Sequence, residues 1–182
     1  MSIKIIALPD ERLKLKSARV DVITPRALAV ALLLSDALDE IPHAVGIAAP
    51  QIAEHLRVIA VDAGKSKHPC NNRGRLILIN PEISASSGRM LSREGCMSVP
   101  GFQGMVERAS DIKITALALD SRLIARIRSC KLSSGLSSGE AVSVCKKIVP
   151  ATFRSSGFEA VVLQHEIDHL DGILFIDRIR HI

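Results

Sequence analysis

The spacing of apolar residues predicts two long helices. Over 24–41 they recur at helical intervals, with Thr24 suited to the N-cap and Pro25 to the first helical position. A second helix is expected over 155–170, where an apolar stripe ends just before Gly172. The stripe consists of Phe158, Val161, Val162, His165 and His169.

Shorter apolar runs, bounded by glycine, asparagine or proline, predict strands in the middle of the chain. The predicted strands cover 56–63, 74–83 and 111–120, with a turn at 70–74. Residues 43–52 are expected to form a loop or strand of small residues. The glycine-containing stretch 93–110 is expected to be rich in loops.

The pattern is weaker over 121–156. Residues 121–132 and 140–153 are consistent with strands, and 133–139 with a flexible link or hairpin tip. The formal net charge of +5 arises from this part of the chain. Because it lacks a nucleic-acid motif, we favour a solvated basic insertion over an RNA-binding surface.

Strands followed by a late, inward-facing helix indicate an α+β fold with antiparallel sheets packed around the helix 155–170. The 182 residues, 47% of them hydrophobic, suit a single domain over 1–182 with 121–156 as an insertion. The chain has no tryptophan and no tyrosine, so the core must be aliphatic. No apolar run approaches membrane-spanning length and no signal peptide is recognisable, so we expect a cytoplasmic protein without membrane contact.

The predicted helix 155–170 contains the sequence HEIDH. His165 and His169 are four residues apart, which places both imidazoles on one helix face, where they can bind one metal ion. Glu166 lies beside the first ligand and can reach a water on that metal. This spacing predicts metal-assisted hydrolysis.

Two histidines do not complete a catalytic metal site, which usually has three protein ligands and one open position. A zinc endopeptidase with this motif would take its third metal ligand from further downstream. Only Asp177 and His181 are available there at any distance. Upstream, Cys96 follows a glycine and could project its sulfur from a turn. Its alternative use is that of a buried apolar residue.

Three short motifs occur in a set order along the chain. They are AVGIAAPQ at 44–51, EGCMS at 94–98 and QHEIDH at 164–169. Together they resemble the motifs of the bacterial peptide deformylases. The resemblance implies metal-dependent hydrolysis of the N-formyl group from the N-terminal formylmethionine of new polypeptides, with release of formate.

The resemblance also implies a role for several residues. Cys96, His165 and His169 would bind the metal. Glu166 would be the general base. Gln51 and the backbone N–H of Met97 would stabilise the negative charge on the formyl oxygen.

Four further residues would bind the substrate. Val45 and Gly46 would pair with its backbone as an added strand. Val161 and Val162, one turn before His165, would line the pocket for the methionine side chain. Glu94 and Asp168 receive no firm role, and Arg93 and Arg108 are left outside the site.

The resemblance implies Fe(II) as the metal, although two histidines and a cysteine also suit Zn(II), Ni(II) or Co(II). It implies formyl-methionyl nascent chains as partners and a monomer. Transient ribosome association is a separate hypothesis, for which the basic insertion is the candidate surface. Ala44 replaces the first glycine of the first motif, and alanine tolerates the backbone geometry of a glycine less well, so we expect this loop to sit differently from that of the family. Two alternatives are a zinc endopeptidase and an inactive binding protein.

Overall fold

The computed structural model describes residues 3–67, 70–134 and 148–179. A five-stranded antiparallel sheet has the order β1-β2-β3-β6-β7, and β4 and β5 form a separate two-stranded sheet. The strands are β1 (Gly46–Ala48), β2 (Val58–Val61), β3 (Leu76–Ser87), β4 (Met90–Cys96), β5 (Val99–Arg108), β6 (Asp111–Leu119) and β7 (Val149–Ser156).

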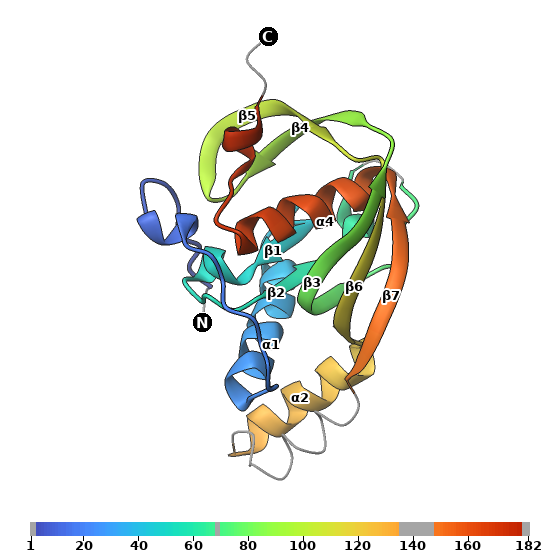
Figure 1. The fold of residues 1–182 in the computed structure, drawn as a ribbon. Coiled ribbons are helices and arrows are strands. Elements are labelled where there is room, and N and C mark those ends of the chain that lie inside the picture. Colours follow the sequence, from blue (N-terminus) through green and yellow to red (C-terminus); the bar gives the residue numbers. More distant parts are fainter. Residues whose placement is uncertain (1–2, 68–69, 135–147, 180–182) are drawn as a thin grey trace.

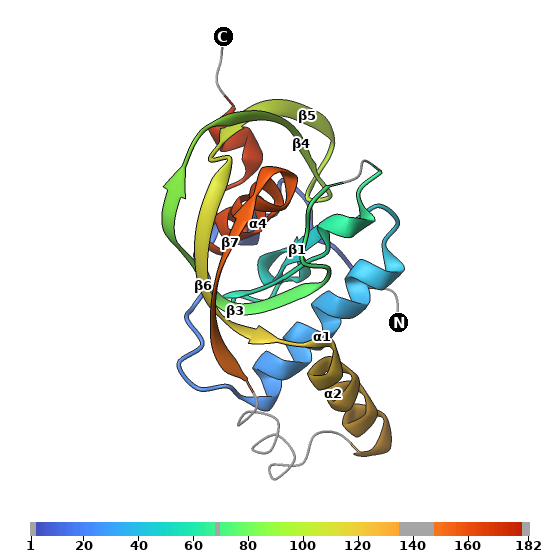
Figure 2. The ribbon, with the colours of Figure 1, turned by 90° about the vertical axis from the view of Figure 1, so that its right-hand side faces the viewer.

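Helix α4 (Gly157–Leu170) lies between the two sheets (Figures 1 and 2). Helix α1 (Pro25–Glu40) covers the opposite face of the large sheet, and α2 (Ser121–Ser134) packs beside α1. The expected antiparallel sheets around a central helix are therefore confirmed. Short 3-10 helices are η1 (Glu11–Lys14), η2 (Ala49–Ile52), η3 (Ala63–Lys65) and η4 (Phe175–Arg178).

Alternation along β2 explains how one sheet serves both helices. Val58 and Ala60 belong to the apolar cluster around α1, whereas Ile59 and Val61 belong to the cluster around α4. Successive side chains of a strand point to opposite faces, so a continuous run of apolar residues builds two cores. The five-stranded sheet is consequently the middle layer of the molecule.

The caps of both predicted helices are as expected. The Thr24 side chain accepts a hydrogen bond from the Ala27 N–H at 3.2 Å, and proline occupies the first helical turn of α1. After α4, Gly172 has a φ of 72°, and its N–H donates to the His169 carbonyl. A Cβ at Gly172 would lie 2.3 Å from the Lys14 carbonyl oxygen, so glycine is required there.

Two expectations about local structure are wrong. Residues 93–110 are mostly strand, because β4 and β5 form a hairpin whose glycines do not interrupt pairing. Residues 121–132 are helical rather than extended. Leu123, Ile124 and Ile127 lie on one face of α2 and join the core around α1.

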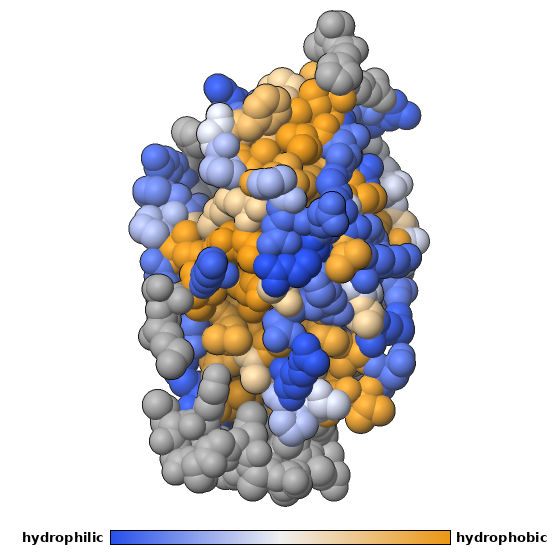
Figure 3. All heavy atoms as spheres, turned by 90° about the vertical axis from the view of Figure 1, so that its left-hand side faces the viewer, coloured by the Kyte–Doolittle hydropathy of each residue, from blue (hydrophilic) through white to orange (hydrophobic). Residues whose placement is uncertain are grey.

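The predicted strand 140–153 lies partly outside the described residues, and its end forms β7. None of the helices in the described ranges is both long and apolar enough to cross a membrane. Figure 3 shows apolar residues gathered in the upper half of one face, at the level of the β4–β5 sheet in Figure 1. Exposed apolar side chains on these two strands include Leu91, Phe102 and Met105.

Candidate active site

Helix α4 and the end of β4 bring three potential metal ligands together. Cys96, His165 and His169 each offer one ligand atom, and these atoms lie within 4.8 Å of one another. The Cys96 sulfur is 3.3 Å from the His169 Nε2. The i, i+4 spacing thus places both imidazoles against the cysteine, as the sequence predicted.

The chemistry of this donor set fits a divalent transition metal. One thiolate and two imidazoles suit Zn(II), Fe(II), Co(II) or Ni(II). Burial lowers the pKa of His169 well below its usual value, so its ring is neutral and able to bind a metal. Burial alone would also lower the pKa of His165, but hydrogen bonds with Cys96 and Glu94 raise it to about 10. The neighbours of His165 therefore stabilise a positive charge at that ring, whereas His169 stays neutral.

A buried network of ion pairs holds His165 in place. Glu94 Oε2 lies 2.8 Å from His165 Nδ1, and both Glu94 oxygens accept from Arg108 at 2.7 and 2.9 Å. Arg108 also donates to Asp168, which accepts two further hydrogen bonds from Arg178. A proton on Nδ1 would donate to Glu94 and leave Nε2 free for the metal.

The charge state of Glu94 follows from this network. Burial would raise its pKa, but hydrogen bonds from Arg108 and His165 lower it to about 2. The sequence pattern assigns no firm role to Glu94 and Asp168 and leaves Arg108 outside the site. Their contacts join β4, β5 and α4 across up to 71 residues of sequence, so no local pattern signals them.

Glu166 is buried beside the ligand cluster. Its side chain is 4% exposed, and its Oε2 has no hydrogen-bond partner among the described residues. Burial raises its pKa to about 7, so it can accept and release a proton near neutral pH. A Cβ at Gly46 would lie 2.3 Å from Glu166 Oε1, so the glycine makes room for this carboxylate.

The amide of Gln51 is fixed in orientation. Its Oε1 accepts from the Ala48 N–H at 2.9 Å, which directs its Nε2 toward Ser98 Oγ at 3.2 Å and the Cys96 sulfur at 3.4 Å. Gln51 is 1% exposed. It therefore presents an N–H donor to the space beside the ligand cluster.

A cavity of about 210 Å³ opens beside these groups. It lies between β1, an edge strand of the large sheet, and β4. Its walls include every residue predicted for substrate binding, together with most of the predicted catalytic and metal-binding residues. The predicted residues that line it are Val45, Gly46, Gln51, Cys96, Met97, Val161, Val162, His165 and Glu166.

The model of the polypeptide deformylase family matches residues 2–128 and 146–182. A peptide deformylase of Thermomicrobium roseum is 36% identical over 176 residues, which cover 96% of this chain and 84% of the relative. One from Desulfitobacterium hafniense is 35% identical over 177 residues, covering 96% and 93%. The chain belongs to the polypeptide deformylase family.

Solved structures agree with this assignment. A peptide deformylase from Legionella pneumophila aligns with a TM-score of 0.72 at 30% identity and covers 99% of this chain and 87% of its own. A class I type b peptide deformylase from Acinetobacter baumannii, solved with Met-Ala-Ser bound, aligns with a TM-score of 0.74 at 29% identity, covering 98% and 99%.

This deformylase is a metal-dependent hydrolase that removes the N-formyl group from the N-terminal formylmethionine of polypeptides. The two alternatives, an endopeptidase and an inactive binding protein, are set aside. The part of the chain that the family model leaves unmatched is 129–145, shorter than the expected insertion of 121–156.

Ala44 needs no backbone conformation that favours glycine. The left-handed residue of its turn is His43, with a φ of 63°, and Ala44 does not have a positive φ. Ala44 is instead buried in the core around α1. The deformylase loop thus tolerates alanine here without backbone strain.

Proposed function

We propose that Cys96, His165 and His169 bind the catalytic metal of this deformylase, and that Glu166 is its general base. The observation that carries the proposal is the cluster of three ligand atoms within 4.8 Å beside a buried carboxylate oxygen without a partner. The metal is proposed to be Fe(II), with Zn(II), Ni(II) or Co(II) as substitutes that the same donors accept. When bound, such an ion acidifies water and polarises the formyl carbonyl.

Glu166 is proposed to move the proton. Its Oε2 accepts a proton from the attacking water and returns it to the leaving amine nitrogen. A pKa of about 7 suits both steps, because the group neither holds the proton too tightly nor releases it too readily. Water attack breaks the C–N bond of the formamide and yields formate and a free amino terminus.

Gln51 and Met97 are proposed to stabilise the negative charge that develops on the formyl oxygen. The Gln51 Nε2–H is already directed toward Cys96, because its Oε1 is held by the Ala48 N–H. A donor fixed before the reaction costs no reorganisation. The backbone N–H of Met97, directly after Cys96, would be the second donor.

Substrate binding is proposed to use the free edge of β1. Val45 and Gly46 would pair with the peptide backbone. Strand β1 lies at the edge of the sheet, with β2 on one side, so a peptide can add on the other side. Val161 and Val162 would contact the methionine side chain in the cavity. The Met-Ala-Ser peptide bound to the Acinetobacter relative has the sequence of a deformylated amino terminus, which supports a methionyl peptide as the ligand.

We also propose a single-domain, monomeric cytoplasmic enzyme that associates transiently with ribosomes through its basic segment, 121–156. The support is charge: the exposed face of α2 carries Arg122 and Arg126. Reversing both charges in an Arg122→Glu/Arg126→Glu double variant should weaken co-sedimentation with ribosomes at low salt. Unchanged co-sedimentation would contradict ribosome binding by this segment.

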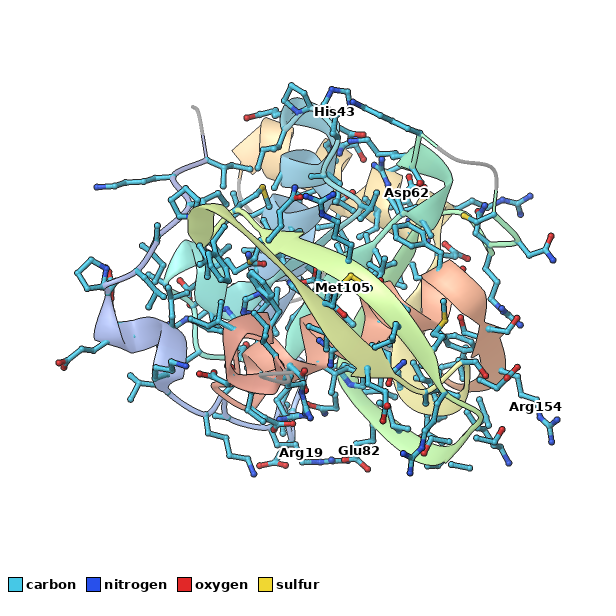
Figure 4. All side chains as sticks on the ribbon, turned by 90° about the horizontal axis from the view of Figure 1, so that it is seen from above. Arg19, His43, Asp62, Glu82, Met105 and Arg154 are labelled. Carbon is cyan, nitrogen blue, oxygen red and sulfur yellow. The ribbon has the colours of Figure 1, made fainter. Side chains whose placement is uncertain are left out.

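The site is tested by formate release from formyl-Met-Ala-Ser, using protein prepared anaerobically with Fe(II). We expect Glu166→Ala to lower kcat by about 10²- to 10⁴-fold. Glu82→Ala is the matched control, because Glu82 is an exposed carboxylate paired with Arg19 (Figure 4). An active Glu166→Ala enzyme would contradict the role of Glu166.

A further inference from the structure

A second, more open depression continues outward from the catalytic cavity. The two share the wall residues His43, Ala44, Arg93, Gly95, Cys96 and Met97. The outer depression adds residues from the β4–β5 turn, including Phe102 and Gln103. Because they share wall residues, the two depressions form one groove. The catalytic cavity is its deep half, and the outer depression is its shallow half.

The shallow half has a basic character. Arg93 and His43 are exposed and come from different elements, β4 and the turn between α1 and β1. Figure 4 shows His43 at the edge of the molecule. No hydrogen bond or ion pair is recorded for the Arg93 side chain within the described residues, so its charge is available to a ligand.

Within the part of the chain that the structure describes, no acidic residue lines the shallow half. The carboxylates that line the deep half are Glu94 and Glu166. Glu94 is neutralised by Arg108, and Glu166 is buried beside the metal ligands. Alternation along β4 separates Glu94, which is buried, from its neighbour Arg93, which is exposed at the groove wall. Among the described residues that line the shallow half, Arg93 therefore carries the formal charge, and His43 adds a ring nitrogen.

The path of a bound peptide leads past these two residues. With formylmethionine in the deep half, an extended chain advances about 3.3 Å per residue. The second and third residues consequently leave through the shallow half, where long side chains on its walls can reach them. Exposed charges on these walls therefore interact with the second and third residues of the peptide and not with the reacting formyl group.

We infer that this deformylase favours chains with aspartate or glutamate at the second or third residue, which Arg93 recognises with His43 as a further hydrogen-bond donor. The inference rests on the proposed placement of formylmethionine in the deep half. A solvent-exposed ion pair of this kind changes kcat/KM by about two- to fivefold. The change is expected mainly in KM, because the contact is equal in the bound substrate and the transition state.

The test compares four peptides in formate-release assays at low ionic strength. They are formyl-Met-Ala-Ser, formyl-Met-Asp-Ser, formyl-Met-Ala-Asp and formyl-Met-Lys-Ser. We expect kcat/KM to be highest for at least one acidic peptide, about two- to fivefold above the neutral one, and lowest for the lysine peptide. Added salt should reduce these ratios because the contact is exposed.

Variants identify the residue responsible. Arg93→Gln should abolish the acidic preference, Arg93→Lys should keep part of it, and Arg93→Glu should reverse it. Arg154→Glu is the matched control: it makes the same charge change on β7, outside both halves of the groove (Figure 4). It should keep the preference.

Equal kcat/KM for the acidic, neutral and lysine peptides would overturn the inference. So would an acidic preference that survives Arg93→Gln, or one that Arg154→Glu removes equally. Failure of the proposed function is a separate result, because it would appear as no formate from formyl-Met-Ala-Ser with the wild-type enzyme.

Discussion

Helices α4 and α2 have the same length of 14 residues but opposite surroundings. Helix α4 lies between two sheets and is buried on nearly all sides, including Glu166, Asp168 and His169. Helix α2 packs one face on α1 and exposes the residues described on its other face, including Arg122 and Arg126. The same kind of helix thus places polar groups in two different dielectric environments.

This difference determines what the polar groups can do. On α4 they are desolvated, so each is either paired or chemically poised: Asp168 is bound by Arg108 and Arg178, and Glu166 has a raised pKa. On α2 the charges are hydrated, so their interactions with neighbours are weak. The raised pKa of Glu166 and the pairing of Asp168 therefore depend on the burial of α4.

The largest expected effect comes from removing the central cation of the buried network. Arg108→Ala would leave Glu94 and Asp168 without their shared partner in the interior. We expect a loss of about 3–5 kcal/mol in the free energy of unfolding, measured by urea denaturation. Arg89→Ala, which removes an exposed pair with Glu107, is the control and should cost below about 1 kcal/mol. Equal losses would contradict the comparison.

The next effect separates stability from catalysis. Ile127 is fully buried between α2 and the core around α1, so Ile127→Ala should lower the free energy of unfolding by about 2–5 kcal/mol. Because α2 does not line the catalytic cavity, kcat at a temperature where the variant is folded should be unchanged. A lowered kcat in the folded variant would show that α2 supports the site.

The third effect is a loss of catalysis, caused by crowding the proposed base Glu166. In Gly46→Ala the added methyl group would meet Glu166 Oε1, and burial prevents the carboxylate from moving into solvent. We expect kcat to fall by about 10²-fold, because a displacement of this size misplaces the proton acceptor. Metal content, measured on the same samples, should stay at the wild-type value. A fully active variant would contradict the proposed position of the base.

The smallest effect is expected on the exposed face of α2. Arg128 pairs with Asp36 on α1, and both side chains are partly exposed. Arg128→Ala should therefore change the free energy of unfolding by less than about 1 kcal/mol, and this difference should shrink at high salt. A loss similar to that of Arg108→Ala would show that α2 is more tightly bound than its exposure indicates.

Sequence reasoning succeeded where local spacing carries the information. The apolar stripe that ends before Gly172 predicts α4. Histidines at i, i+4 with an adjacent glutamate predict which residues this helix contributes to the candidate site. It failed for α2, because Leu123, Ile124 and Ile127 alternate with arginines and satisfy helix and strand patterns equally well. Tertiary packing on α1 decides between them.

Sequence reasoning also missed the support of the site. The sequence predicts loops over the β4–β5 hairpin because its glycines weaken the strand pattern, although pairing between the two strands stabilises it. The pairing of Arg108 with Glu94 and Asp168 depends on that hairpin folding over α4. Such long-range contacts leave no periodic signal in the chain.

The central claim is that the metal ligands, Cys96 on β4 with His165 and His169 on α4, and the base Glu166 are separate groups brought together in one site. Its most direct test is the absorption of Co(II)-loaded protein, read together with formate release. We expect the thiolate-to-cobalt band in wild type and in the inactive Glu166→Ala. It should also remain in Cys70→Ser, because Cys70 is a free cysteine outside the ligand cluster. The band should be lost in Cys96→Ser. A band that persists in Cys96→Ser, or is lost in Glu166→Ala, would contradict the account.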